Sequence, residues 1–462
     1  MRVETTGSSA EAEPAVERRV AEYLPRAIEL LSSLIEIPSI SRGRDHADDV
    51  RASAHECARI LAEIGLDPRV VDAGGHPSVI ARKEGPAGAP TVLLYAHHDV
   101  QPVSEGDWHS PAFAPSVREG RLYGRGSADD KAGFLVHVAA LAAWADELPV
   151  GVALLIDGEE EIGSPTLEGL LERYSDVLDA DVLIIADSIN WAVDVPGLTT
   201  TLRGLVDVAV EVSVLDGPVH SGAYGGVVPD ALTTLCALLG TLHTAEGELA
   251  VEGLTSVPGE PEAVLEEQSL RDDAHVLDGV ALMGSGSIAG RLWWRPSATV
   301  TGVDAPSVAD APNALIPSAR ARISMRIAPN DTPESALAAL TSHLERHVRL
   351  GARVDVTPLV MAHPSDVLPP ADIRSAALGA LSDGWGVRAV ETGIGGTLPL
   401  IRVFENALPG IAILSTGVQD PRTNAHGDDE SVDLAGFARS CTAEALLLGR
   451  LASVASRRSA AD

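Results

Sequence analysis

The amino-acid sequence predicts an α/β catalytic domain, with a mostly parallel sheet flanked by helices, and a second α+β domain inserted into it. Short, nearly continuous apolar runs indicate strands that are buried on both faces. These runs alternate with stretches of helical periodicity, which is the pattern of a parallel sheet covered on both sides. The apolar runs are residues 91–96 (TVLLYA), 151–156 (GVALLI) and 181–186 (DVLIIA), and the helical stretches between them are 131–147 and 166–178.

A change of pattern after Gly204 indicates the inserted domain. Residues 205–214 (LVDVAVEVSV) alternate as a half-buried strand does, and a buried strand of the first type returns at 411–414. Because 462 residues exceed the size at which one core usually stops growing, two domains are expected. We predict a split catalytic, metal-binding domain at 1–204 and 365–462 and a lid and dimerisation domain at 205–364. The lid should continue with a helix at 229–242, a strand at 321–327, a helix at 333–347 and a strand at 354–359.

The composition excludes several classes of partner. The formal net charge is −32, and Lys83 and Lys131 are the two lysines, so the surface should repel nucleic acid and anionic membranes. The three cysteines are far apart and lack Cys-x-x-Cys spacing, which argues against a thiolate zinc site and for a reducing compartment. The polar N-terminus lacks the apolar core of a signal peptide, and no apolar run reaches the roughly 18 residues of a membrane span. We expect a cytoplasmic protein.

Acids and imidazoles follow the predicted buried strands. In open parallel sheets, ligands bind beyond the carboxyl ends of the strands, so these side chains should collect at one edge. Several carboxylates in one place repel each other unless cations join them, and mixed imidazole and carboxylate ligands suit zinc. One further carboxylate, not bound to metal, would serve as a general base. The side chains that follow these strands are His97, His98 and Asp99, then Asp157 and Glu159–Glu161, then Asp187, and finally His426, and a further acid pair, Asp129 and Asp130, begins a predicted helix.

Four segments then resemble the metal-binding motifs of the M20 metallopeptidase family, and most closely its carnosinase-like dipeptidase branch. The segments are 95–102 (YAHHDVQP), 124–131 (GRGSADDK), 159–164 (EEEIGS) and 426–430 (HGDDE). They occur in the family's order, and the resemblance covers nearly the whole chain. It implies hydrolysis of an amide bond in a dipeptide or small peptide by a metal-activated water.

The resemblance also implies the role of each residue in the metal centre. Two Zn²⁺ per subunit are expected, with Mn²⁺ or Co²⁺ as alternatives. Asp99 would fix the tautomer of His97, and Glu160 would act as the general base that later protonates the leaving amine. Asp129 would bridge the two metals, with His97 and Asp187 completing one site and Glu161 and His426 the other.

Further residues of the resemblance lie on the lid and in a glycine-rich loop. His220 would reach the site of the partner subunit in a homodimer and stabilise the oxyanion there. Asn313 would contact the substrate, and Arg326 would clamp its carboxylate together with Gly396 and Thr397 of the loop. Many dipeptidase relatives carry Arg at the position of Gly393, so we expect this glycine to alter carboxylate recognition.

Three other functions stay open at this point, and one of them, a protein-interaction module, predicts that no metal is bound, which metal analysis would test. A deacylase acting on an N-acyl amino acid would share the metal centre and differ in its pocket, so substrate profiling separates the two. A metal-binding protein without catalysis would lack Glu160, which is present. We interpret Asp130 as a helix-start or metal-adjacent residue, and expect Asp428, Asp429 and Glu430 to be solvated local supports.

Overall fold

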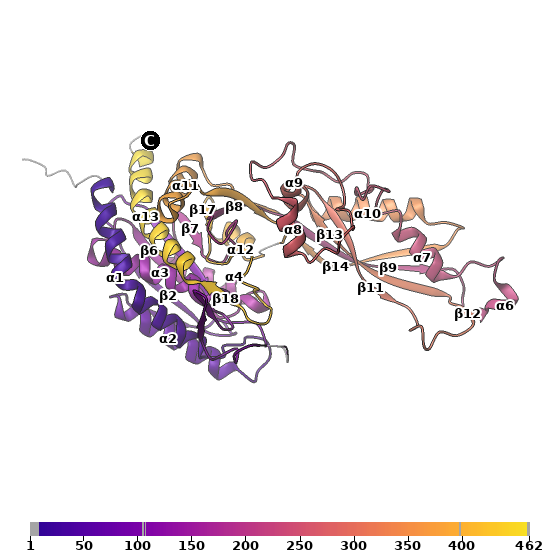
Figure 1. Cartoon of the computed structure of the whole chain (residues 1–462), viewed down its shortest axis with the longest axis horizontal. Coiled ribbons are helices and arrows are strands. Elements are labelled where there is room, and N and C mark those ends of the chain that lie inside the picture. Colours follow the sequence, from indigo (N-terminus) through magenta and orange to yellow (C-terminus); the bar gives the residue numbers. More distant parts are fainter. Residues whose placement is uncertain (1–8, 104–105, 107, 397–398, 460–462) are drawn as a thin grey trace, which may run out of the picture. The chain divides into compact units, whose positions relative to one another are not determined.

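A computed structural model describes residues 9–103, 106, 108–396 and 399–459. The chain forms two compact units (Figure 1). Unit 1 comprises Met1–Thr200, Val367–Thr392 and Leu400–Asp462, and unit 2 comprises Thr201–Asp366 and Gly393–Pro399. Residues 393–399, which the sequence places in the catalytic domain, therefore group with the inserted unit. None of the helices in the described ranges is long and apolar enough to cross a membrane.

The sheet of unit 1 has four parallel strands at its centre. β6 (Gly151–Asp157), β3 (Thr91–His97), β7 (Val182–Ile185) and β17 (Ala412–Ser415) lie side by side in that order. All seven residues of β6 are buried, as expected for a strand that is covered on both faces. The predicted fold class is confirmed. Antiparallel strands extend this centre: β1 (Arg69–Val71) and β2 (Ser78–Lys83) beside β6, and β8 (Gly197–Leu202) beside β17.

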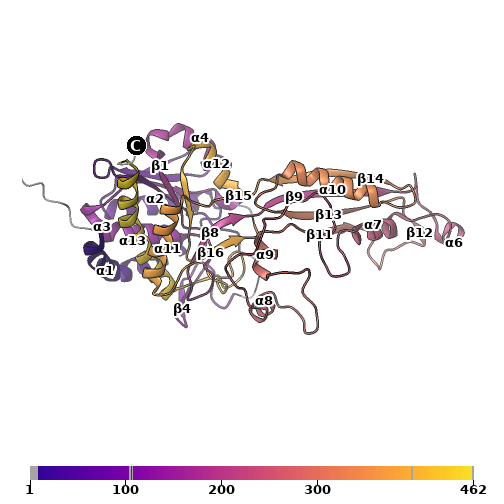
Figure 2. The same ribbon diagram turned by 90° about the horizontal axis from the view of Figure 1, so that it is seen from above.

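Helices cover the two faces of this sheet (Figures 1 and 2). Val92 and Leu94 of β3 join the main core cluster, whereas Tyr95 points to the opposite face and meets Phe404 edge-on at 5.4 Å. This alternation follows from the period of two along a strand. The main cluster includes residues of α1 (Ser9–Ile35), α2 (Ala47–Glu63), α3 (Lys131–Trp144), α11 (Ala371–Trp385) and α13 (Leu434–Ser459). The other helices of unit 1 are α4 (Leu167–Arg173), α5 (Ser175–Leu178) and α12 (Pro399–Ala407).

Three short strands form a second sheet in unit 1. β18 (Ser431–Asp433) pairs with β5 (Arg121–Tyr123), which pairs with β4 (Ser116–Arg118). The pairing joins two segments that are far apart in the sequence, one before Asp129 and one after His426. It therefore holds two predicted metal-ligand loops next to each other.

Unit 2 is an antiparallel sheet with helices on one face. Its strand order is β11 (Ser297–Asp304), β13 (Ser318–Ile327), β9 (Gly204–Ser213) and β14 (Arg353–Ala362). Alternate residues of β9 and β13 pack with the helices α7 (Ala231–Leu239) and α10 (Pro333–His347) into a separate core. β11 was not predicted, because six of its eight residues are exposed and its apolar pattern is weak. Smaller elements of this unit are β10 (Val219–His220), α6 (Ser221–Tyr224), α8 (Glu267–Asp273), α9 (Ile288–Trp293) and β12 (Ala314–Leu315). β15 (Ser365–Asp366) and β16 (Val390–Ile394) both pair with β8 of the large sheet.

Candidate metal centre

The parallel register of unit 1 brings the predicted site residues to one edge of the sheet. His97 is the last residue of β3 and lies opposite Asp157, the last residue of β6. Beyond β6 the chain makes a short 3-10 turn, Glu160–Ile162, which carries two of the predicted acids. Asp187 follows the end of β7 by two residues. Parallel strands end at the same edge of the sheet, and the carboxylates and the imidazole that follow them therefore lie together there.

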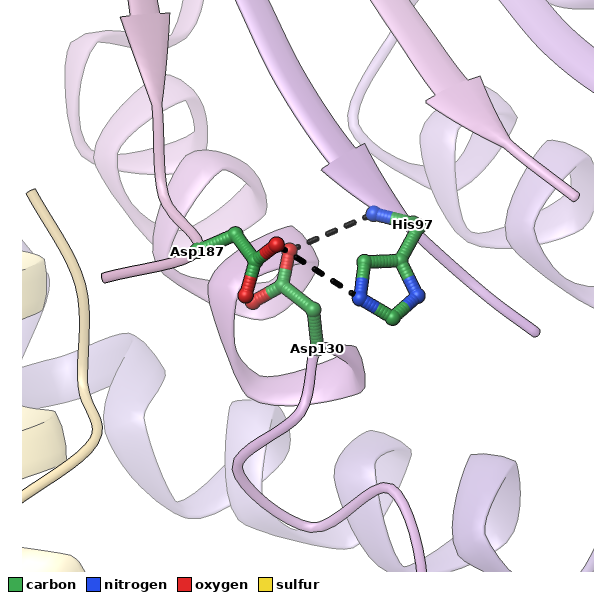
Figure 3. A group of neighbouring side chains, drawn as sticks. All are labelled: His97, Asp130 and Asp187. Carbon is green, nitrogen blue, oxygen red and sulfur yellow. Dashed lines mark hydrogen bonds and ion pairs between the residues drawn. The ribbon is translucent and has the colours of Figure 1, made fainter. Parts of the chain in front are cut away.

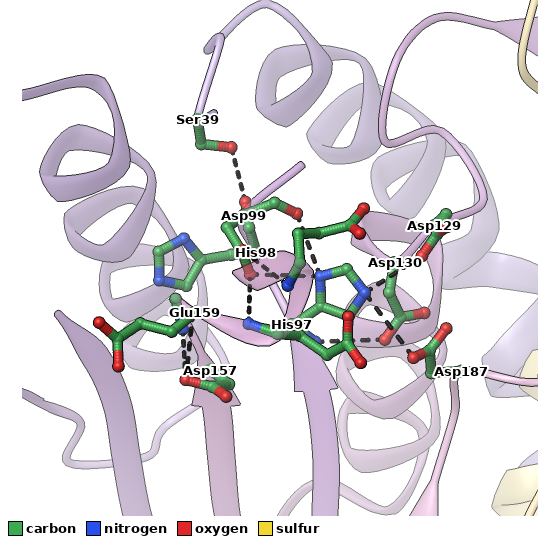
Figure 4. A network of polar contacts seen from close by, with 12 residues as sticks. Ser39, His97, His98, Asp99, Asp129, Asp130, Asp157, Glu159 and Asp187 are labelled. Carbon is green, nitrogen blue, oxygen red and sulfur yellow. Dashed lines mark hydrogen bonds and ion pairs between the residues drawn. The ribbon is translucent and has the colours of Figure 1, made fainter. Parts of the chain in front are cut away.

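Asp129 lies between two imidazoles. Its Oδ1 is 3.1 Å from His97 Nε2, and its Oδ2 is 3.0 Å from His426 Nε2. His97 Nε2 is also 3.8 Å from Asp187 Oδ2, and His426 Nε2 is 3.3 Å from Glu161 Oε2. The structure thus brings together all five predicted ligands, in two groups that share one carboxylate; Figure 4 shows the group around His97.

Asp130 is a further member of this cluster. It stands at the N-cap position of α3, but its side chain makes no capping hydrogen bond, so the helix-start interpretation does not explain it. Instead its Oδ2 accepts a hydrogen bond from the backbone N–H of His97 at 3.2 Å. Figure 3 shows it beside Asp187 and the same imidazole, and these three residues could hold a metal ion together.

Asp99 links the first imidazole to the turn that carries the acids. His97 Nδ1 is 3.0 Å from the backbone oxygen of Asp99 and 3.4 Å from its Oδ1. The same carboxylate accepts hydrogen bonds from the backbone N–H groups of Glu160 and Glu161, both at 3.1 Å. Burial opposes the charge on Asp99, but the hydrogen bond and charge of His97 keep its pKa below the usual value. Asp99 therefore contacts three of the residues predicted for the site at once.

The carboxyl group of Glu160 has a raised pKa. Burial raises the pKa of this carboxyl to about 7. The nearby charge of His97 lowers this pKa, whereas the charges of Glu161, Asp129 and Asp99 raise it. A general acid–base group works best when its pKa is near the working pH. Bound cations would lower this pKa, because they favour the charged carboxylate.

The charges of the cluster fit divalent metal ions. Burial raises the pKa of Asp187 and of Asp130 well above the usual value, and the neighbouring carboxylates raise both further. Such crowding is unfavourable unless cations neutralise it. Two imidazoles and several carboxylates are ligands that suit zinc and related ions. The described residues therefore fit a metal-dependent hydrolase with a dinuclear centre.

Glu430 corrects one expectation from the sequence. Its side chain is fully buried, not solvated, and it ion-pairs with Arg125 at 2.8 Å. Its two oxygens also accept hydrogen bonds from the backbone N–H groups of Gly126 (3.0 Å), Ala128 (3.0 Å) and Asp129 (3.1 Å). The neighbouring Asp429 is different, since it pairs near the surface with His109 and Arg118. If Arg125 in the GRGSADDK segment is buried, it needs an acidic partner, but the sequence alone does not identify which acid that is.

The predicted residues of the lid lie at two ends of unit 2. His220 and Asn313 are exposed residues near the β10–β12 pair, beyond the end of the sheet at which Ser213 faces Ser318. Arg326 is at the opposite end, where it faces Leu205. Gly396 is described in the loop after β16, and Thr397 lies outside the described residues.

Gly393 has no room for a larger side chain. A Cβ atom there would lie 2.7 Å from Thr201 Oγ1 and 2.7 Å from Trp293 Cβ. Real Cβ atoms essentially never approach so closely. An arginine at this position would have to displace both neighbours. The residue at position 393 therefore contributes no positive charge in this chain.

Comparison with known proteins finds relatives along most of the chain. The family described as "Peptidase family M20/M25/M40" matches residues 93–450. The chain is 34% identical over 441 residues to a cysteinylglycine-S-conjugate dipeptidase of Corynebacterium striatum, with 92% of this chain and 95% of the relative covered. It is 27% identical over 394 residues to a Beta-Ala-His dipeptidase of Homo sapiens, with 81% and 73% covered. Human carnosine dipeptidase 1 has the same fold, with a TM-score of 0.75 at 23% identity over 96% of this chain and 99% of that one.

Proposed function

We propose that this chain, which belongs to peptidase family M20/M25/M40, is a dipeptidase that cleaves the amide bond of small peptides ending in a free carboxylate. The observation that carries the proposal is the position of Asp129. One of its oxygens faces His97 and the other faces His426, as a carboxylate shared by two metal ions would require. The similarity to proteins named as dipeptidases favours a peptide over an N-acyl amino acid.

The roles of the residues follow from their contacts. His97, Asp129 and Asp187 would hold one ion, and Glu161 and His426, with Asp129, the other; we propose Zn²⁺, with Mn²⁺ or Co²⁺ as alternatives. Such ions polarise the scissile carbonyl and make water a better nucleophile at neutral pH. Glu160 would take a proton from the attacking water and deliver it to the leaving amine. Asp99 would fix the orientation of His97 and the position of the turn that carries Glu160.

A homodimer would complete the site. β9 and β13 pair over ten residues, and at about 3.4 Å per residue they span roughly 30 Å between the end near His220 and the end near Arg326. One dipeptide cannot reach both ends within one subunit. We therefore propose that His220 and Asn313 serve the site of a second copy. The exposed Val300 and Val303 of β11 and Met361 of β14, on the two edge strands of this sheet, suit burial against that copy.

A substrate panel tests the reaction. Purified protein with Zn²⁺, Mn²⁺ or Co²⁺ is assayed against dipeptides, tripeptides and N-acyl amino acids. We expect turnover of dipeptides and of a cysteinylglycine S-conjugate, and much lower turnover of N-acyl amino acids. A preference for the acylated amino acids would replace the dipeptidase proposal with a deacylase.

Substitution of the general base tests the mechanism. Glu160→Gln keeps the shape of the side chain but cannot accept a proton, so the rate should fall at least about 10²-fold while metal content is unchanged. Glu168→Gln, an exposed change on α4, is the matched control. A Glu160→Gln protein within a few-fold of the wild type would remove Glu160 from the mechanism.

A mixing experiment tests the contribution of the second subunit. His220→Ala and Glu160→Gln subunits, each with little activity alone, are combined into heterodimers. If His220 acts on the partner's site, each heterodimer has one intact site and activity returns toward half. If heterodimers form and no activity returns, His220 does not act across the interface.

A further inference from the structure

Arg203 is a buried arginine that has no acidic partner among the described residues. It lies directly before β9 and is 7% exposed. Its Nη1 donates to three neutral acceptors: Ser297 Oγ at 3.1 Å, the Arg295 carbonyl at 3.3 Å and the Arg291 carbonyl at 3.5 Å. Its Nε is buried and has no hydrogen-bond partner. Among the residues that the structure describes, no carboxylate forms an ion pair with it.

The charged group that acts on Arg203 is another cation. Burial lowers the pKa of Arg203 to about 10, and the charge of Arg326 lowers it further. The two side chains belong to the same end of the unit 2 sheet, because Arg326 faces Ser297 across the β11–β13 ladder and Arg203 donates to Ser297. Two guanidinium groups without a described counter-charge are unfavourable unless an anion joins them.

The glycine-rich loop lies directly against Arg203. The backbone N–H of Arg203 donates to the carbonyl of Ile394 at 3.1 Å. A Cβ atom on Gly395 would lie 2.8 Å from Arg203 Nη2, so glycine is needed for the guanidinium to approach the loop so closely. Position 393 provides no cation here, as shown above. Arg203 therefore offers positive charge beside this loop, and Arg326 lies at the same end of the unit 2 sheet.

We propose that Arg203 binds the terminal carboxylate of the substrate together with Arg326, and so determines the preference for peptides with a free C-terminus. The proposal rests on the proposed dipeptidase function and adds a specificity residue to it. Guanidinium groups are suited to carboxylates because their planar donors match the two oxygens. The alternative is a purely structural role, in which Arg203 only caps the carbonyl groups at the end of α9.

Kinetics with paired substrates distinguish the two roles. The wild type, Arg203→Met, Arg203→Lys and the control Arg320→Met are assayed with glycylglycine and with glycylglycine amide. Arg320 is an exposed residue of β13 with no ion pair among the described residues. We expect Arg203→Met to raise the KM for glycylglycine at least about 10-fold, with little change for the amide or in kcat. Arg203→Lys keeps the positive charge but lacks the planar guanidinium donors that bind both carboxylate oxygens. Its increase in KM should therefore be smaller than that of Arg203→Met and should again affect only glycylglycine.

The outcomes separate this proposal from the proposed function. If the wild type cleaves glycylglycine but Arg203→Lys and Arg203→Met change both substrates equally, or neither, Arg203 is structural and the inference is wrong. If the thermal midpoint shows that Arg203→Met does not fold, Arg203→Lys is used instead. The test is then whether the ratio of its KM for glycylglycine to its KM for glycylglycine amide rises above the wild-type ratio. If the wild type cleaves no dipeptide at all, the proposed function fails first, whatever the variants do.

Discussion

Replacement of Glu430 by Gln should destabilise the metal-free protein strongly. In the native structure one oxygen of Glu430 accepts from Arg125 and Gly126, and the other accepts from Ala128 and Asp129. Glutamine has one acceptor oxygen, so its amide nitrogen must face two donors. Two charge-assisted hydrogen bonds are lost, and the Arg125 side chain, only 2% exposed, loses its counter-charge.

The magnitude follows from burial. Hydrogen bonds to charged groups contribute about 1.5–3 kcal/mol each, and removing one partner of a buried pair costs about 3–5 kcal/mol in total. We expect a loss of about 4 kcal/mol in the free energy of unfolding. Because the same carboxylate fixes the backbone of Asp129, metal affinity should also fall, by about 10–100-fold.

Urea unfolding of chelator-treated protein, followed by tryptophan fluorescence, measures the first effect, and metal titration measures the second. Asp429→Asn is the control, since it changes the adjacent residue of the same loop. That side chain is 22% exposed and pairs near the surface, so its replacement should cost under about 1 kcal/mol. Equal unfolding midpoints for the two variants would refute the role given to Glu430.

Three further predictions concern other parts of the chain. Elemental analysis of active protein should find two divalent ions per subunit, and a chelator should abolish turnover; one ion or none in active protein would contradict the shared role of Asp129. His137 pairs with Glu444 at 2.6 Å, and although burial lowers its pKa, that carboxylate and the Tyr95 carbonyl raise it above the usual value. Because the pKa of His137 is raised in the folded state, its ion pair stabilises the protein fully below the unfolded pKa of about 6.5, and this stabilisation is lost as the pH rises through the folded pKa. The difference in free energy of unfolding between the wild type and Glu444→Gln, measured by urea unfolding at several pH values, should therefore become smaller at alkaline pH. Gly393→Arg should lower the thermal midpoint, with overpacking costing about 1–3 kcal/mol, and should not improve carboxylate binding; a lower KM for glycylglycine in a stable variant would show that the position opens to the substrate.

The sequence predicted the parallel sheet and the main members of the metal cluster because both are local signals. Continuous apolar runs mark buried strands, and the residues that follow them must meet at one edge. The positions of His97 and Asp187 followed from this rule. The expectation that Glu161 and His426 meet Asp129 came from the resemblance to the M20 family.

The residues that the sequence did not place depend on contacts between distant segments. Glu430 reads as one acid among several in an acidic loop, and its burial follows only from the fold that brings Arg125 to it. Asp130 occupies a helix N-cap, where acids are common for a local reason, so the sequence could not decide between a helix-start role and a place beside the metal ligands, and its proximity to Asp187 comes from the fold. Arg203 was not singled out, because its lack of an acidic partner is a property of the packed structure.

The wide separation of Arg125 and Glu430 has a consequence for biosynthesis. The two residues are 305 positions apart, and β17, which lies between β7 and β8, comes from the same late part of the chain. At roughly 5–20 residues per second, a ribosome needs about 15 s to 1 min to make the intervening segment. During that time the nascent chain has His97, Asp129 and Asp187 but neither His426 nor the carboxylate that orders the Asp129 loop. Completion of the proposed centre therefore waits for the synthesis of His426 and Glu430, and until then the emerging chain carries an incomplete set of the proposed ligands.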